Sequence, residues 1–259
     1  MKIGLIIYGS LDTLSGGYLY DRQLVATLRA NDCEVDILSL PWRDYGAHLG
    51  DNFLLNWALQ IADAHYDLLL EDELNHPSLF LLNFFLRRFC DCPLISIVHH
   101  LRLSEVHPAS LLPFYSIVER LYLSSVDGFI FNSHTTRRTV EAQIGRQKPN
   151  VVSFPAADHR TPPSRHQVID AISQRLGSQG PLQLLFVGNL ISRKGLHILF
   201  DALARLSTQE WHLHIVGSEE IDPEYSAAMR HRANILSLTT RLTWHGRVDD
   251  HKLNRLFAT

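Results

Sequence analysis

The stretch LQLLFVGNLISRKGLHILFDALARL, residues 182–206, constrains the fold of this chain more than any other. It opens with a largely apolar run whose length predicts a buried parallel strand, and Gly188 ends that run. From Gly195 onward, apolar residues recur at the spacing of an amphipathic helix. A strand, a glycine-bearing loop and a helix predict a βα unit. The helix start offers N–H groups and a positive dipole end to a phosphate.

The same alternation of strand and helix patterns extends over most of the chain. The expected strands are residues 2–8, 34–40, 65–70, 93–98, 128–131, 150–154, 182–187, 211–216 and 241–244. Amphipathic patterns between them predict helices, among them 52–62, 77–89, 113–125 and 194–207. Successive parallel strands need helical crossovers, so the pattern predicts parallel sheets with helices on both faces.

A cluster of prolines and glycines between Pro155 and Pro181 interrupts this alternation. Such clusters are typical of linkers, and one short helix is expected near residues 168–176. The prediction is therefore a first domain over residues 1–160, a linker over 161–180 and a second domain over 181–259.

Composition narrows the class of protein. A net charge of -3 and a hydrophobic share of 46% fit a soluble globular protein and give no indication of a nucleic-acid partner. The three cysteines show no C-x-x-C spacing, which favours reduced thiols in the cytoplasm. The apolar segment 79–86 is too short to span a bilayer and is followed by Arg87 and Arg88. It is interpreted as a packed helix, with a membrane-surface patch as the alternative.

The segment FVGNLISRKGLHILFDAL resembles the start of the second domain in GT-B glycosyltransferases of family 4, the group 1 transferases. Gly188, the Lys194-Gly195 pair and the following helix match the family pattern, whereas Asn189 stands where the family more often has Arg. The resemblance implies an α/β protein of GT-B type with two Rossmann-like, doubly wound parallel-sheet domains. The first would lie on the acceptor side and the second would bind a nucleotide-sugar.

Three residues are expected to hold the donor phosphates in the second domain: Gly188, Arg193 and Lys194. Fixed cations beside a helix dipole stabilise a leaving diphosphate without a metal. The alternative is a solvated Arg-Lys pair in an ordinary loop. After the next two strands, Gly217 and Gly246 follow, and the resemblance assigns their loops, with Arg247 and Val248, to the nucleotide.

In the first domain, His99 is the candidate catalytic residue, because it stands at the end of the expected strand 93–98 and matches the family's histidine. His100 follows it where the family commonly has Asp. Gly16 and Gly17 open a helix and are assigned to the donor phosphates as well. The alternatives are a histidine satisfied in the core and a plain flexible loop.

No metal site is predicted. His245, Asp249, Asp250 and His251 lie close together in sequence, but exposed loop polarity and a helix N-cap account for them better. The family's pair of donor-binding glutamates would come after Ala258. The second domain is therefore expected to be incomplete.

The leading hypothesis is a glycosyltransferase that moves a sugar from a nucleotide-sugar to an unidentified acceptor, retaining and metal-independent as the resemblance implies. The nucleotide-sugar would be the donor substrate, and no cofactor is expected. The acceptor would be a sugar or a lipid-linked molecule, and the protein would be cytoplasmic, with peripheral membrane contact left open. Two alternatives remain: a non-catalytic relative that acts as a binding module, and a sugar-nucleotide epimerase of similar two-domain fold.

Overall fold

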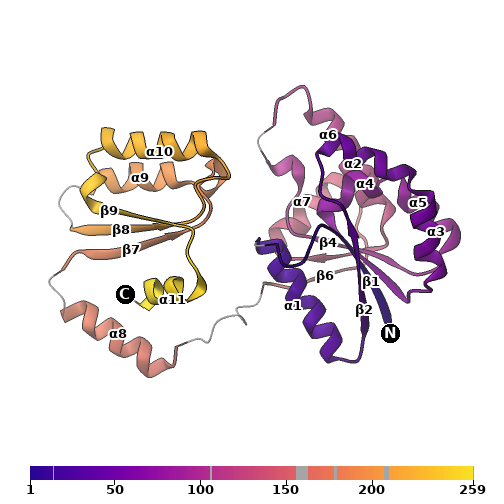
Figure 1. Ribbon diagram of the computed structural model, residues 1–259, viewed down its shortest axis with the longest axis horizontal. Coiled ribbons are helices and arrows are strands. Elements are labelled where there is room, and N and C mark those ends of the chain that lie inside the picture. Colours follow the sequence, from indigo (N-terminus) through magenta and orange to yellow (C-terminus); the bar gives the residue numbers. More distant parts are fainter. Residues whose placement is uncertain (14, 106, 156–162, 178–179, 207–209, 259) are drawn as a thin grey trace. The chain divides into compact units, whose positions relative to one another are not determined.

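A computed structural model describes residues 1–13, 15–105, 107–155, 163–177, 180–206 and 210–258. The chain divides into two compact units, Met1–Thr161 and Pro162–Thr259 (Figure 1). The expected boundary between residues 160 and 161 lies outside the described residues.

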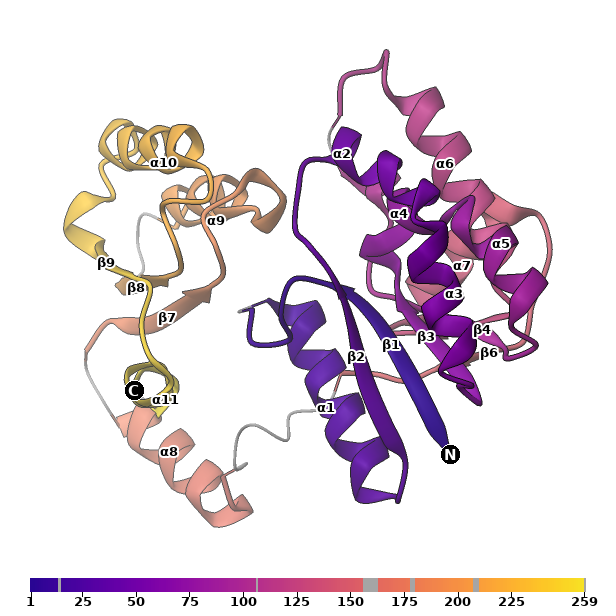
Figure 2. The ribbon, with the colours of Figure 1, turned by 45° about the vertical axis from the view of Figure 1, so that its right-hand side comes forward.

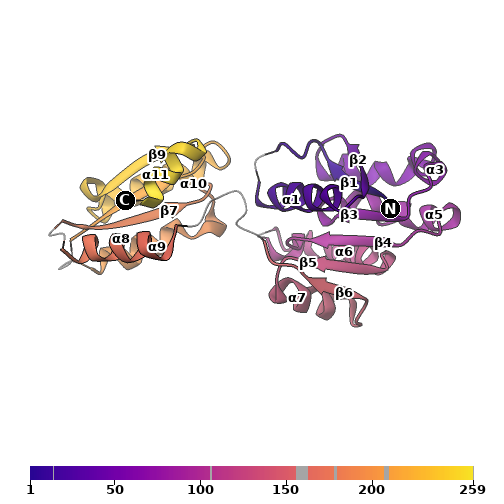
Figure 3. The same ribbon diagram turned by 90° about the horizontal axis from the view of Figure 1, so that it is seen from below.

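Unit 1 contains one six-stranded parallel sheet in the order β2-β1-β3-β4-β5-β6, which can be followed in Figure 3. Its strands are β1 Lys2–Tyr8, β2 Glu34–Leu40, β3 Leu68–Asp72, β4 Leu94–Val98, β5 Gly128–Phe131 and β6 Asn150–Val152. The strand order reverses between β1 and β3. In open α/β sheets, such a switch point opens a crevice at the carboxyl ends of the strands.

Helices cover both faces of this sheet, as the alternation predicted (Figure 2). They are α1 Gly16–Ala30, α2 Tyr45–Leu49, α3 Leu55–Asp63, α4 His76–Leu79, α5 Leu82–Phe89, α6 Leu112–Ser125 and α7 His134–Ile144, with short 3-10 turns η1 Gly50–Phe53, η2 Glu73–Asn75 and η3 Arg102–Ser104. Helix α1 packs on one face against Ile3, Leu5 and Ile7. Helices α3, α5, α6 and α7 pack on the other face, where the larger core lies.

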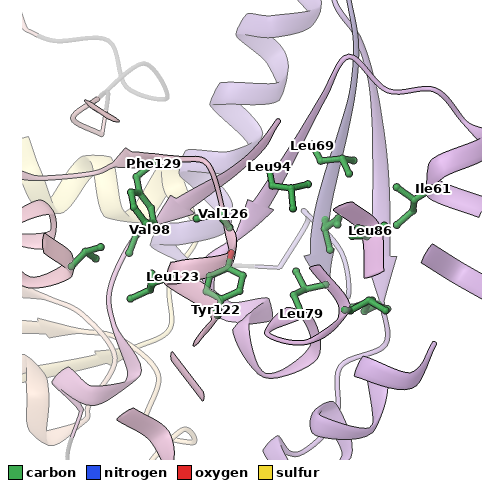
Figure 4. Packing of buried hydrophobic residues seen from close by; sticks show 14 of the residues in the cluster. Ile61, Leu69, Leu79, Leu86, Leu94, Val98, Tyr122, Leu123, Val126 and Phe129 are labelled. Atoms are coloured by element: carbon green, nitrogen blue, oxygen red, sulfur yellow. The ribbon is translucent and has the colours of Figure 1, made fainter. Parts of the chain in front are cut away.

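That larger core is apolar and closely packed. Leu86 of α5 and Tyr122 of α6 are fully buried against Leu69 and Leu94 of the sheet (Figure 4). Burying a side chain of this size contributes about 1.5–3 kcal/mol. The inward faces of α5 and α6 therefore anchor these two helices firmly to the sheet.

Two expected elements of unit 1 differ most clearly from the structure. The helix predicted over 77–89 is split into α4 and α5, because the buried Asn52 side chain accepts hydrogen bonds from the N–H groups of Leu81 and Leu82. The strand predicted over 65–70 runs later and includes Glu71 and Asp72, both buried.

Unit 2 contains a three-stranded parallel sheet in the order β7-β8-β9. Its elements are α8 Arg165–Gly177, β7 Leu182–Val187, η4 Ser192–Lys194, α9 Leu196–Ala204, β8 Trp211–Val216, α10 Pro223–Ile235, η5 Thr239–Arg241, β9 Leu242–Gly246 and α11 Asp250–Ala258. Helices α9 and α10 cover one face of the sheet, and α8 and α11 lie on the other side (Figure 1). Helix α8 begins and ends within the segment expected to be a linker.

Strand β7 forms as predicted but is not buried as predicted. Leu182 is 60% exposed and Val187 is 46% exposed. The reason is its place at the edge of the sheet, where a strand has a neighbour on one side alone.

Within the described residues, no helix is long and apolar enough to cross a membrane.

Candidate functional site

The carboxyl edge of the unit 1 sheet carries the start of helix α1. Ser15 caps this helix, its hydroxyl oxygen accepting from the N–H of Tyr18. Gly16 and Gly17 form the first two helical positions. A Cβ at residue 17 would stand 3.2 Å from Cδ2 of His99, whereas one at residue 16 would meet no atom within 4 Å. The glycine pair therefore brings the helix backbone against the histidine that follows β4.

His99 is fixed by a buried carboxylate from α1. Its Nε2 lies 3.0 Å from Oδ1 of Asp21, which is fully buried, and its own side chain is 14% exposed. Tyr20 packs edge-on against the imidazole, with ring centroids 5.1 Å apart. Burial alone would lower the pKa of His99, but the hydrogen bond to Asp21 and the acidic side chains around the imidazole outweigh burial and raise that pKa. A protonated His99 donates to Asp21 through Nε2 and presents Nδ1–H as a second donor.

Asp72, at the end of β3, completes a buried group with Asp21 and His99. One ligand-type atom from each of the three lies within 4.8 Å of the others. Burial, followed by the charge of Asp21, raises the pKa of Asp72 to about 8. This shift favours the protonated form of Asp72, whose proton relieves the repulsion between the two buried carboxyl groups.

A second buried group contains Glu73, His76 and Glu119, again within 4.8 Å. Burial raises the pKa of Glu73 to about 8 and that of Glu119 to about 7, and burial lowers the pKa of His76 to about 4. At neutral pH, Glu73 is therefore protonated and His76 uncharged, so the group carries little charge in its apolar surroundings.

A cavity of about 180 Å³ lies above this second group. Its wall includes Trp42, Tyr45, His100 and Arg102. The Arg102 guanidinium carbon lies 4.4 Å from the ring centroid of Tyr45 and 4.6 Å from that of Tyr115. In the described part of the chain, Arg102 forms no ion pair, and its buried Nε has no hydrogen-bond partner. His100 lies 3.0 Å from Oε1 of Glu105 and lacks the buried partner that His99 has.

In unit 2, three glycines stand at the carboxyl ends of the three strands. Gly188 donates its N–H to Val216 O at 2.9 Å, and Gly217 donates its N–H to Gly246 O at 2.9 Å. A Cβ on Gly217 would lie 1.9 Å from the carbonyl oxygen of Gly188, which no side chain tolerates. The loops after β7 and β8 therefore approach so closely that only glycine fits at position 217.

Lys194 lies along the first of these loops. Its Cδ and Cγ would be 3.5 and 3.6 Å from a Cβ on Gly188. Arg193 and Lys194 are exposed, and neither forms an ion pair within the described ranges. Both are therefore available to an anion beside Gly188.

The start of helix α9 differs from the prediction. The expected helix over 194–207 begins at Leu196, because Gly195 takes a left-handed conformation (φ 73°) after the 3-10 turn that holds Arg193 and Lys194. The helix also ends earlier than predicted, at Ala204, because Arg205 and Leu206 are no longer helical. At the start of α9, two backbone N–H groups already have acceptors. The N–H of His197 donates to the hydroxyl of Tyr225, and the N–H of Ile198 donates to the carbonyl oxygen of Gly195.

Beyond β9, Arg247 is exposed and Val248 is half-buried, just before α11. Asp249 accepts from the N–H of Lys252 at 2.7 Å and so has the N-cap role expected for it. His245 Nε2 lies 3.0 Å from His214 Nδ1. His245 and Asp249 therefore have hydrogen-bond partners within unit 2.

Sequence reasoning missed the acids of these two buried groups, Asp21, Asp72, Glu73 and Glu119. One signal was present, since Glu71-Asp72-Glu73 directly follows an apolar run at a strand end. Asp21 gave no signal, because its partner lies 78 residues away.

Residues 168–259 match the family model "Glycosyl transferases group 1". The carboxyl-terminal part of this chain therefore resembles a group 1 glycosyl transferase domain. The match begins within α8 and takes in the three glycines, Arg193 and Lys194. The family resemblance found in the sequence is thereby confirmed. No curated protein sequence matches the chain.

Solved structures extend the likeness in fold beyond the group 1 domain. Sucrose-phosphate synthase from Thermosynechococcus elongatus is 18% identical with a TM-score of 0.70, over 99% of this chain and 72% of that one. HepE of Anabaena, solved with UDP and glucose, is 20% identical with a TM-score of 0.63, over 96% and 70%. The trehalose 6-phosphate synthase of Burkholderia multivorans is 13% identical with a TM-score of 0.62, over 98% and 75%. The predicted GT-B type fold is confirmed.

Proposed function

We propose that this protein transfers a sugar from a nucleotide-sugar donor to an acceptor, with retention and without a metal. The observation that carries the proposal is the unit 2 loop in which Lys194 lies along Gly188, beside the tightly approaching Gly217, in a group 1 glycosyl transferase domain. The UDP and UDP-glucose complexes of HepE, a protein of the same fold, support a nucleotide-sugar as donor.

In this proposal, Lys194 and Arg193 bind the donor diphosphate. Negative charge develops on that group as the glycosidic bond breaks, and fixed cations stabilise it. Asn189 is uncharged, so the two exposed cations supply the positive charge of this loop. The loops that hold Gly217 and Gly246 lie beside the nucleotide, and Arg247 and Val248 contact it.

His99 is the proposed catalytic group of unit 1. Its raised pKa favours the imidazolium more strongly than an ordinary histidine pKa would, and Asp21 keeps the ring in one orientation. The imidazolium would donate a hydrogen bond through Nδ1 to a sugar hydroxyl or to the departing phosphate. Gly16 and Gly17 bring the N-terminus of α1 to the same place, where its dipole favours an anion.

The acceptor binds, in the same proposal, in the cavity beside Arg102. Trp42 is 62% exposed and offers an apolar ring face to a sugar. Arg102 carries a positive charge held between two tyrosine rings, which suits an acidic or phosphorylated group on the acceptor. A sugar or a lipid-linked molecule with such a group fits this wall, and the proposed location is the cytoplasm.

Calorimetry with UDP, GDP and ADP, and with their glucose conjugates, tests the donor site. We expect Lys194→Ala to weaken binding of the preferred nucleotide-sugar about tenfold or more, since losing a charge-assisted hydrogen bond costs about 1.5–3 kcal/mol. Arg193→Ala should weaken it less, and Arg205→Ala, an exposed arginine after α9, should leave it unchanged. Equal affinities for wild type and Lys194→Ala would refute the phosphate site.

A further inference from the structure

The outer faces of α5 and α6 have an unusual composition. Their inner residues, such as Leu86 and Tyr122, are fully buried in the unit 1 core. Every exposed residue on these two helices is either apolar or an arginine, and the single acidic residue, Glu119, is buried. We call this surface the α5–α6 face, and its exposed residues are Phe84, Phe85, Arg87, Arg88, Phe89, Leu112, Pro113, Phe114, Ile117, Arg120 and Leu121.

The apolar side chains of this face are well exposed. Ile117 is 60% exposed, Phe89 57% and Phe84 50%. Helix α5 contacts both α6 and α3, and the segment before α3 adds Phe53, which is 76% exposed (Figures 1 and 2). The exposed apolar groups therefore extend over α5, α6 and the segment before α3. A surface of this extent on one side of a soluble unit marks an interaction site.

Positive charge borders the apolar groups. In the part of the chain that the structure describes, Arg88 and Arg120 form no ion pair. Arg87 pairs with Asp127 at 2.8 Å beside a cavity of about 340 Å³, whose wall also includes Arg146 and Lys148. Acidic side chains near the face are few: Asp127 is already paired, and Asp63 and Asp91 lie at its edge.

The distribution of charge on the α5–α6 face indicates which kind of partner binds there. A second copy of the chain, paired through the same face about a two-fold axis, would present the same exposed residues of α5 and α6, so Arg88 and Arg120 would find no acidic partner on those helices. A bilayer with anionic headgroups offers an apolar layer for the phenylalanines and negative charge for the arginines. Surface helices with one apolar face and flanking arginines bind membranes in this way.

We propose that the α5–α6 face docks unit 1 on an anionic lipid bilayer. Phe84, Phe85 and Ile117 enter the boundary between headgroups and acyl chains, and Arg88 and Arg120 bind lipid phosphates. This docking depends neither on sugar transfer nor on the donor site, so the two proposals fail independently.

Flotation of the whole chain with lipid vesicles tests the proposal. We expect binding to vesicles of phosphatidylcholine and phosphatidylglycerol in equal parts, and much weaker binding to pure phosphatidylcholine. Rising salt should weaken the former, because exposed charges are screened. Equal binding to both vesicle types, or to neither, overturns the proposal.

Matched variants test whether vesicle binding depends on this face or on nonspecific contacts elsewhere on the protein. Ile117→Ser should reduce binding at least about fivefold, whereas Ile235→Ser, at a similarly exposed isoleucine of α10, should not. Arg88→Gln and Arg120→Gln should each reduce binding about fivefold, and Arg205→Gln should have no effect. An equal loss with the control variants overturns the assignment to this face.

Two further measurements complete the test. Thermal unfolding shows whether Ile117→Ser is folded. If it is not, the two arginine variants decide, because they keep every apolar group. Analytical ultracentrifugation addresses the competing occupant: a dimer of the wild type that Ile117→Ser abolishes, without vesicle binding, would assign the face to a second copy and overturn the lipid proposal.

Discussion

The imidazole of His99 and the carboxylate of Asp21 form a buried pair, with Nε2 and Oδ1 3.0 Å apart. The two residues come from the end of β4 and the second turn of α1. Gly17 lies beneath the same imidazole. One histidine therefore joins the start of the first helix to the carboxyl edge of the sheet, and its protonation can be tested directly.

Asp21→Asn should lower the pKa of His99 below its ordinary value of 6.5, because burial persists while the charged acceptor is lost. In the wild type, the raised pKa adds stability below about pH 6.5, and that gain disappears as pH rises through the folded-state pKa. Side-chain NMR titration of His99 gives the measurement. Glu105→Gln, which removes the partner of His100, serves as control. An unchanged His99 pKa in Asp21→Asn would contradict the assignment.

Gly16→Ala and Gly17→Ala should behave differently although they are adjacent. A methyl group at residue 16 meets nothing and should be neutral or stabilise by about 0.4–1 kcal/mol. At residue 17 it presses on the imidazole at 3.2 Å, so the ring must move and the contact with Asp21 should weaken. The His99 titration and thermal unfolding report both effects. If the two variants show the same His99 pKa, Gly17 does not position the ring.

Gly217→Ala should destabilise unit 2 by about 3 kcal/mol, because its Cβ would lie 1.9 Å from the backbone oxygen of Gly188, which cannot rotate away. Gly177→Ala, at the end of α8, meets no neighbour and is the control. Denaturant unfolding of both variants provides the comparison. Equal midpoints would show that the loops after β7 and β8 have room to separate.

Glu71→Gln should make the protein more stable at pH 8 and change little at pH 4. Burial raises the pKa of Glu71 to about 7. The folded state therefore holds a proton that the unfolded chain releases near pH 4.5, and the wild type loses stability as pH rises between these values. The loss is on the order of 3 kcal/mol, which glutamine avoids.

Thermal unfolding across this pH range tests that effect. Glu220→Gln, at an exposed carboxylate, should follow the wild type at every pH. A difference between Glu71→Gln and wild type that stays constant with pH would exclude titration of Glu71 as its cause.

The sequence by itself determined the local units. Strands β1, β2 and β7 have the predicted bounds. Strands β1 and β7 are mostly apolar runs that end before a glycine, whereas β2 alternates apolar and polar residues and ends before Pro41. The loop with Gly188 and the Lys194-Gly195 pair was also predictable, since its pattern lies within a few consecutive residues. Periodicity and turn chemistry act over such short distances, and the alternation of strands and helices was enough to predict parallel sheets.

Tertiary structure alone decided the chemistry of the site. Asp21 meets His99, and Asp72 joins them, because the sheet order places β3 and β4 beside the start of α1. Gly217 is required by the approach of Gly188, which no local pattern records. The exposure of Ile117 and the burial of Glu119 on one helix depend on the side that faces the core. Desolvation and close contact are properties of residues brought together from distant positions, so they exist only once the chain has folded.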